Sequence, residues 1–147
     1  MSGALSDAEL VARFEGAPVD HDNKHFYRGL LDRELRLNRC SDCGTWHQPP
    51  RAVCPACWSP AVAATAVSGR GVIHMVLFMY QGPPTPGVDY SVPHPVVTVE
   101  LEEQEGLRYT STVVDAPNDQ IVVGAPVTLD WIERNGTPFP VFRLVED

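Results

Sequence analysis

The sequence is short of basic side chains, and the shortage is concentrated in its second half. Residues 58–147 carry four basic and eleven acidic side chains, a net charge of -7, whereas residues 1–57 have a net charge of -1. An acidic surface repels phosphate backbones and anionic headgroups. We therefore expect no general attraction of the second half to nucleic acid or to an anionic membrane.

Long apolar runs are also missing. Residues 1–16 hold no segment like the apolar part of a signal peptide, and no stretch approaches the roughly 20 residues that cross a membrane. Hydrophobic residues still make up 44% of the 147 residues, which is enough for a core. This length suits one domain, or a small domain with an attached module, and we expect the protein in the cytoplasm.

Cysteine is absent outside one short stretch, which holds all four cysteines as two Cys-x-x-Cys pairs, Cys40/Cys43 and Cys54/Cys57. One tight turn aims both sulfurs of such a pair at one metal ion. Two pairs then complete a tetrahedral four-sulfur site of the kind that Zn²⁺ accepts. Gly44 follows the second cysteine and fits a turn that needs positive φ. The spacing predicts one zinc ion per chain.

Two alternatives to zinc remain, a disulfide pair and an iron site. Disulfides need an oxidising compartment, which nothing in the sequence indicates. Iron in four sulfurs would make the protein an electron carrier. Zinc is favoured, and because the protein supplies all four ligands the metal is structural rather than catalytic. Such a site contributes roughly 10–16 kcal/mol to the folding of a small module.

Helical patterns precede the cysteines. Ser6 and Glu9 form a capping-box pattern, which predicts a short helix stopped at Gly16. Apolar residues at helical spacing predict a second helix from Asn23 to Leu35, although Gly29 weakens it. A strand should then lead into the first cysteine pair.

Strand patterns follow the cysteines. We expect an entry strand at 61–67 and a long strand at 72–80 that is buried on both faces for part of its length. Residues 81–95 contain five prolines and read as a loop. Alternating residues over 97–113 predict a hairpin, and Asn135-Gly136 marks the turn of another.

These patterns predict a mostly β protein with N-terminal helices. The strand count fits a five-stranded barrel of the OB type, with a small sandwich as the alternative. The expected parts are an N-terminal helical arm (residues 1–36), a zinc ribbon (37–60) and an OB-fold domain (61–147). We find no set of nucleophile, base and orienting residue, so no catalytic residue is predicted.

The motifs together resemble those of the DUF35 family, zinc-ribbon proteins with a C-terminal OB fold, over about residues 20–144. The resemblance is carried by the cysteine pairs and by Leu35-x-Leu37, Pro49-Pro50-Arg51, Ser68-Gly69-Arg70-Gly71, Val99-Glu100-Leu101, Gly124-x-Pro126-Val127 and Pro140-Val141-Phe142-Arg143. It implies an accessory subunit of thiolase-superfamily enzymes that act on coenzyme A (CoA) thioesters. In bacteria such partners include lipid-transfer-protein-like thiolases and aldolases that shorten steroid side chains.

Five residues are candidates for contacting CoA or the partner enzyme. Arginines near the ribbon would bind phosphates, and aromatic side chains are typical of interface cores. The candidates are Arg39, Trp46, Arg51, Arg70 and His94. For the arginines, pairing with local carboxylates is the alternative.

We therefore expect a non-catalytic subunit that docks on a thiolase or retro-aldolase and helps it handle acyl-CoA in lipid or steroid side-chain breakdown. We also expect this chain and the enzyme to form a hetero-oligomer, with acyl-CoA at the interface between them. The main rival is a protein that binds single-stranded nucleic acid, since ribbons and OB folds often do so. The acidic second half argues against that rival.

Overall fold

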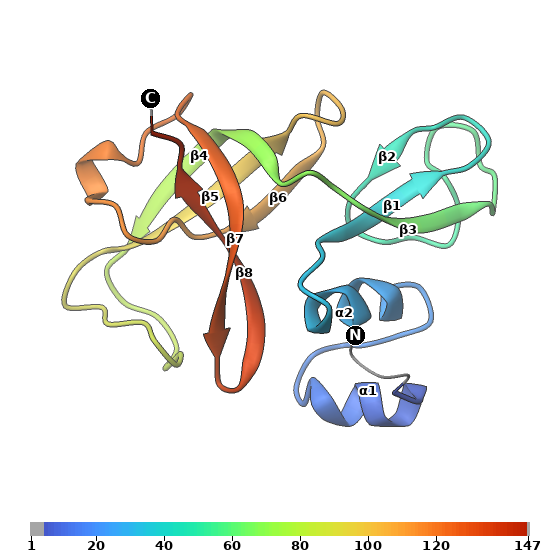
Figure 1. Ribbon diagram of the computed structural model, residues 1–147, viewed down its shortest axis with the longest axis horizontal. Helices are drawn as coiled ribbons and strands as arrows, with labels where there is room; N and C mark the ends of the chain where they lie inside the picture. The colour runs from blue at the N-terminus through green and yellow to red at the C-terminus, as the bar shows by residue number, and fades with distance from the viewer. Residues whose placement is uncertain (1–4, 147) are drawn as a thin grey trace. The chain divides into compact units, whose positions relative to one another are not determined.

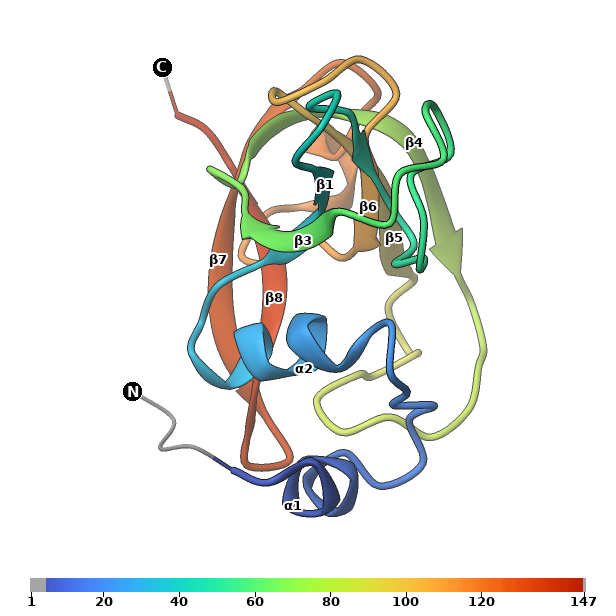
Figure 2. The same ribbon diagram turned by 90° about the vertical axis from the view of Figure 1, so that its right-hand side faces the viewer.

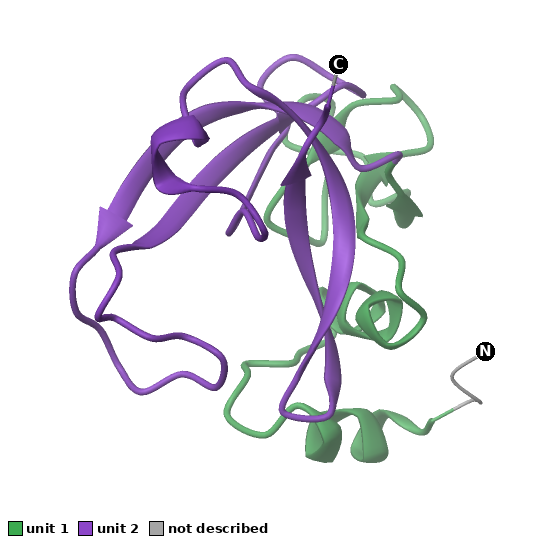
Figure 3. Cartoon of the chain, turned by 60° about the vertical axis from the view of Figure 1, so that its left-hand side comes forward, with its two compact units in different colours: residues 1–67 green, residues 68–147 purple. Residues whose placement is uncertain are grey.

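The protein divides after Val67 into two compact units, unit 1 (residues 1–67) and unit 2 (residues 68–147), as seen in a computed structural model that describes residues 5–146 (Figure 3). None of the helices in the described part of the chain is long and apolar enough to cross a membrane. The predicted division into three parts, with boundaries after residues 36 and 60, stays a prediction.

Unit 1 combines two short helices with a three-stranded antiparallel sheet of order β2-β1-β3 (Figure 1). Its elements are α1 (Asp7–Arg13), α2 (Lys24–Leu31), β1 (Arg36–Cys40), β2 (Trp46–His47) and β3 (Val62–Ala66). The strand predicted at 61–67 is present as β3, and it pairs with β1 along its whole length, from Arg36 opposite Ala66 to Cys40 opposite Val62 (Figure 2).

The first helix begins as its sequence predicts. The Ser6 hydroxyl accepts a hydrogen bond from the Glu9 backbone N–H (3.2 Å), and the Glu9 carboxylate accepts one from the Ser6 N–H (2.8 Å). Arg28 of α2 holds this helix, because its guanidinium donates to the Leu5 carbonyl and to Asp7, both at 2.7 Å. The two helices therefore form one arm, in which Leu10 is fully buried.

The second helix is shorter than predicted and ends at Leu31. The chain turns back at Arg33, which has positive φ, and the Glu34 N–H then donates to the Gly29 carbonyl at 2.8 Å. A Cβ atom on Gly29 would lie 2.6 Å from the Glu34 carbonyl oxygen, so only glycine allows this close return. The glycine that weakens the helical pattern is thus what lets β1 start early.

Unit 2 is a single curled antiparallel sheet of five strands in the order β6-β5-β4-β7-β8 (Figure 1). The strands are β4 (Arg70–Met79), β5 (His94–Leu101), β6 (Arg108–Ser111), β7 (Pro126–Arg134) and β8 (Thr137–Leu144), with a 3-10 turn η1 at Asn118–Gln120. Because all five strands belong to one sheet, the prediction of an OB-type fold is confirmed and the sandwich alternative is wrong.

The sheet curls until its two ends meet at Phe142. Its backbone N–H donates to the Thr112 carbonyl (2.9 Å), and its carbonyl accepts from the Val114 N–H (3.0 Å). Val113 lies opposite Phe142 as an isolated bridge. The Phe142 side chain is fully buried.

The long strand β4 differs from its prediction. Its apolar run is not buried on both faces: Ile73 is buried, but Met75 and Leu77 are 52% and 45% exposed. The physical reason is that β7 pairs with β4 only at Arg70–Val72. Beyond a register shift between Ile73 and Met75, β4 has a neighbouring strand only on the β5 side.

Candidate functional site

The four cysteine sulfurs converge at one end of the ribbon sheet. All lie within 4.8 Å of one another, with 3.6 Å between Cys40 and Cys57 and 3.6 Å between Cys43 and Cys54. Four sulfurs placed about 2.3 Å from a tetrahedral metal are about 3.8 Å apart, whereas a disulfide needs about 2.05 Å. The geometry therefore fits a four-thiolate metal centre and excludes disulfides among these four cysteines.

Both turns that present the sulfurs are built alike. The residue after each pair has positive φ, Gly44 at 77° and Trp58 at 65°, and its N–H donates back to the carbonyl of the first cysteine at 2.9 Å. Backbone N–H groups also point at sulfur, as from Cys43 to Cys40 (3.5 Å). Such donors stabilise thiolates, the form that binds metal.

The electrostatics at Cys43 favour the same state. The Thr45 hydroxyl lies 3.1 Å from its sulfur and, with a backbone hydrogen bond from the same residue, lowers the pKa of the Cys43 thiol to about 6. Cys40 and Cys54 are buried, while Cys43 and Cys57 are exposed. Because four protein ligands fill a tetrahedral shell, no position is left for a catalytic water, and the centre is a structural metal site.

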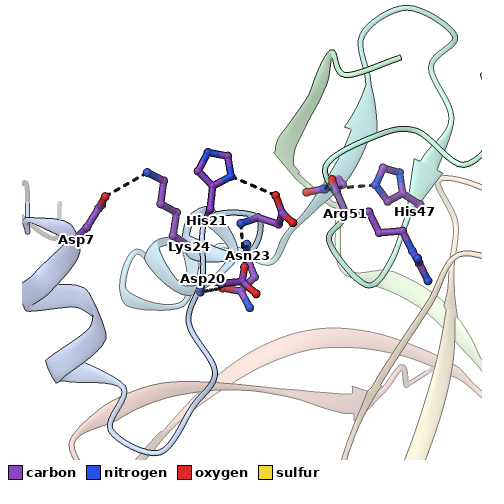
Figure 4. Close-up of polar contacts among 9 residues, drawn as sticks. Asp7, Asp20, His21, Asn23, Lys24, His47 and Arg51 are labelled. Carbon is purple, nitrogen blue, oxygen red and sulfur yellow. Dashed lines mark hydrogen bonds and ion pairs between the residues drawn. The ribbon is translucent and has the colours of Figure 1, made fainter. Parts of the chain in front are cut away.

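A cavity of about 600 Å³ opens in unit 1 between the start of α2 and the ribbon. It is lined by basic side chains from three segments: Lys24 of α2, Arg36 of β1 and Arg51 of the loop between the cysteine pairs. His21 and His25 complete this rim. Figure 4 shows the Lys24 side chain reaching toward Asp7. The lining thus holds three cations and one carboxylate, Asp22, which lies 3.2 Å from the His21 ring.

The three cations differ in how far they are neutralised. Lys24 contacts Asp7 at 3.2 Å, and Arg36 contacts Asp32 at 3.0 Å and Glu34 at 2.5 Å. Arg51 makes no ion pair with any carboxylate in residues 5–146. It is therefore the cation most available to a ligand.

The charge around His25 reports a positive potential. Burial lowers the pKa of His25, and the nearby Lys24, Arg28 and Arg36 lower it further. Asp7 acts in the opposite direction and has the smallest effect.

A side chain of the ribbon sheet holds the backbone of Arg51 by a hydrogen bond. Asn38, on β1, donates from its side-chain amide to the Arg51 carbonyl (3.2 Å) and lies 3.3 Å from the ring of His47 (Figure 4). His47 is 8% exposed, and burial, with Arg51 nearby, lowers its pKa. The buried Asn38–His47 pair fixes where the Arg51 loop crosses the sheet.

The other predicted ligand residues lie elsewhere. Arg39 donates to the Gly44 carbonyl at 3.2 Å and sits over the ring of Trp46, which is buried rather than on the surface. Arg70 and His94 belong to unit 2, where Arg70 pairs with Glu102 at 2.6 Å. Only Arg51 of the five candidates lines the cavity. No local motif in the sequence marks Lys24, His21 or His25 as ligand residues, so these three were not predicted.

Comparison with known proteins matches both units. Residues 28–63 match the family described as "ChsH2, rubredoxin-like zinc ribbon domain" and residues 64–131 the family "ChsH2, C-terminal OB-fold domain". A probable enoyl-CoA hydratase alpha subunit of Thermomonospora curvata is 32% identical over 126 residues, which cover 85% of this chain and 38% of that protein.

Two further matches extend this result. The 3-oxo-4,17-pregnadiene-20-carboxyl-CoA hydratase alpha subunit of Mycobacterium tuberculosis is 31% identical over 76% of this chain and 34% of its own length. This chain thus spans little more than a third of each of these two hydratase subunits. A solved structure, the "Ltp2-ChsH2(DUF35) aldolase", contains a chain that is 32% identical, with a TM-score of 0.76 over 87% of this chain and 98% of that one. With both domains matched in order and a DUF35 chain matched over nearly its full length, this protein belongs to the DUF35 family.

Proposed function

We propose that this chain is a non-catalytic accessory subunit that docks on a thiolase-like or lipid-transfer-protein-like enzyme and helps it handle acyl-CoA substrates. The observation that carries the proposal is the match over 98% of the DUF35 chain in a structure described as an aldolase. That chain corresponds to this one and is named together with Ltp2. Cleavage of a carbon–carbon bond, by thiolysis or a retro-aldol step, then belongs to the partner.

The substrate class follows from the relatives. Both hydratase subunits are named for CoA thioesters, and one of these is a pregnadiene-carboxyl-CoA, a steroid thioester. We infer that this chain serves the breakdown of a steroid or lipid side chain in the cytoplasm. The four-sulfur centre, which we assign to one zinc ion per chain, would hold the ribbon together and take no part in the reaction.

The cavity in unit 1 is our proposed site for the anionic end of CoA. CoA carries phosphate groups, which bind best to arginine guanidinium groups through charge-assisted hydrogen bonds. Arg51 has no ion-pair partner among the described carboxylates, and Lys24 and Arg36 stand beside it in the cavity wall. Of the predicted ligand residues, we therefore place Arg51 first.

The proposed function is tested by co-expression with a thiolase-superfamily protein from the same genome. We expect the two proteins to co-purify and the turnover of an acyl-CoA by the enzyme to fall when this chain is left out. This chain alone should show no turnover of the same thioester. Separate elution of the two proteins, with unchanged turnover, would contradict the proposal, as would thioester cleavage by this chain alone.

Replacing Arg51 tests the CoA site. We expect Arg51→Ala to weaken CoA binding to the complex by about ten- to a hundredfold, since a hydrogen bond to a charged group contributes about 1.5–3 kcal/mol. The measurement is isothermal titration of CoA into the purified complex.

The matched control is Arg108→Ala, which removes an arginine of unit 2 that pairs with Glu100. It should leave CoA affinity unchanged. Equal affinities for the wild type and Arg51→Ala would remove this cavity from the proposal and leave the accessory role intact.

A further inference from the structure

One arginine of unit 2 has no carboxylate partner. The unit holds four arginines, no lysine and eleven carboxylate side chains. Three of the arginines pair with carboxylates: Arg70 with Glu102, Arg108 with Glu100, and Arg143 with Asp115 and Asp130. Arg134, the last residue of β7, makes no ion pair with any carboxylate in residues 5–146. In a unit with so many carboxylates, an unpaired arginine needs a physical explanation.

Arg134 is also partly buried. One face of its guanidinium lies over the ring of Phe139, with the central carbon 3.8 Å from the ring centroid. Its Nε atom is buried and has no hydrogen-bond partner in residues 5–146. Burying a cation without a partner costs free energy, and burial lowers the pKa of Arg134. Native proteins keep few such groups, and a bound ligand is one of the reasons for which they are kept.

The Nη groups of Arg134 remain open to a ligand. They make no hydrogen bond in the described part of the chain, and they are not among its buried polar atoms that lack a partner. Phe139 covers one face of the guanidinium, and the Nε side is closed. The guanidinium therefore offers its donors along the Nη edge.

Two further polar side chains lie close to Arg134. Burial lowers the pKa of His94 and Arg134 lowers it further, while Tyr90 raises the pKa of Arg134 against the larger effect of burial. A charge shifts a pKa only where it is near. The rings of Tyr90 and His94 also contact each other edge to face, with centroids 6.3 Å apart. We call Arg134, His94 and Tyr90 the Arg134 cluster.

The loop that carries Tyr90 is held by hydrogen bonds. The Tyr90 hydroxyl donates to the Pro83 carbonyl (3.3 Å), and a Cβ atom on Gly82 would lie 2.6 Å from its oxygen. The Asn118 side chain donates to the Pro93 carbonyl (2.8 Å), directly before β5. Figures 1 and 3 show this loop, between β4 and β5, at the same end of unit 2 as the β7–β8 turn. The cluster is thus arranged before any ligand binds.

The charge of the cluster selects the ligand. Burial and Arg134 both oppose protonation of His94, so the cluster carries one positive charge, and the neutral imidazole can still donate one hydrogen bond. One charge with donors along a flat edge matches a carboxylate, a planar anion of single charge with two acceptor oxygens. A phosphate monoester, with about two negative charges at neutral pH, would be only half neutralised.

We propose that the Arg134 cluster is a binding site for a carboxylate group, with the Nη groups of Arg134 and the imidazole of His94 as its donors. The carboxylate comes either from an Asp or Glu side chain of the partner enzyme or from a small carboxylic acid. The site itself is independent of the proposed function, and only the first of these sources rests on it.

Titration with acetate tests the site on the free chain. Acetate replaces chloride at constant ionic strength and neutral pH, while NMR follows the Arg134 Nε–H and the ring protons of His94. We expect saturable shifts of both signals, and a higher pKa of His94 in acetate than in chloride, because a nearby anion favours the imidazolium form. Signals that move no more in acetate than in chloride would overturn the proposal.

A substitution assigns the binding to Arg134. We expect Arg134→Gln to weaken acetate binding, read on the His94 ring, by about tenfold or more, because a charge-assisted hydrogen bond is lost. Arg70→Gln removes an arginine that already has a carboxylate partner, and it should bind acetate like the wild type. Equal acetate affinities for Arg134→Gln and the wild type would also overturn the proposal. Circular dichroism melts check that both variants are folded, and the wild-type titration needs no substitution.

Co-expression with the thiolase-superfamily enzyme distinguishes the two sources. If the partner supplies the carboxylate, Arg134→Gln weakens the complex by about tenfold or more, and Arg70→Gln does not. If a small acid fills the site, Arg134→Gln forms the complex like the wild type, and the wild-type complex still binds acetate in saturation-transfer NMR. Either result upholds the site. A wild-type chain that forms no complex would contradict the accessory role, whereas acetate binding at Arg134 in that chain would still uphold the site.

Discussion

Removal of the metal is expected to unfold the ribbon while the sheet of unit 2 stays folded. Metal binding by such modules is coupled to folding and contributes roughly 10–16 kcal/mol, more than the small core around Leu35 and Leu37 can replace. Unit 2 has its own core around Val99 and Phe142. A strong chelator should therefore abolish amide protection in β1 and β3 and leave that in β5.

Hydrogen exchange followed by mass spectrometry measures this result, and native mass spectrometry gives the metal content. We expect one zinc ion per chain and a colourless protein, whereas visible colour would indicate iron. Cys54→Ser should reproduce the effect of the chelator, and Val53→Ser, at the exposed neighbouring position, should not. Persistent protection of β1 in metal-free protein would contradict the structural role.

Truncation of Phe142 is expected to cost about 3–5 kcal/mol of the free energy of unfolding of unit 2, the range for removing a fully buried phenylalanine. Phe142 is 0% exposed and sits where the two ends of the sheet meet. Removing the Phe142 ring leaves a cavity where the two ends of the curled sheet meet. Urea unfolding of Phe142→Ala, followed by the fluorescence of Trp131 on β7, measures the change.

Phe139→Ala is the matched control, since Phe139 lies on the same strand but is only partly buried. Its cost should be clearly smaller. Equal losses for the two variants would mean that closure at Phe142 adds nothing to the stability of unit 2.

Features encoded by neighbouring residues could be predicted from the sequence. Two cysteines with two residues between them define a turn, Ser6 and Glu9 define a helix start, and Asn135-Gly136 defines the β7–β8 hairpin. Each of these depends on contacts within a few residues, so no knowledge of the fold was needed.

Features that depend on distant contacts were not predictable in this way. The exposure of β4 is decided by how far β7, a strand much later in the chain, follows it. The end of α2 depends on a nearer contact, the return of Glu34 to Gly29, which breaks the helical pattern and is not encoded by it. The cavity joins Lys24 to Arg51, which lie on different elements of unit 1. No local pattern brings these residues together. Arg51 was predicted because it is an arginine near the ribbon, and Lys24 was not predicted as a ligand.

The hydrogen bond from Asn38 to the Arg51 carbonyl makes the position of Arg51 depend on the supply of metal. Asn38 stands two residues before Cys40, and Arg51 three residues before Cys54, so both are tethered to the same ion. In a cell starved of zinc, newly made chains would lack this tether, and the guanidinium would sample many positions. On the proposed CoA site and zinc assignment, the zinc supply would set the fraction of chains whose Arg51 is held in place.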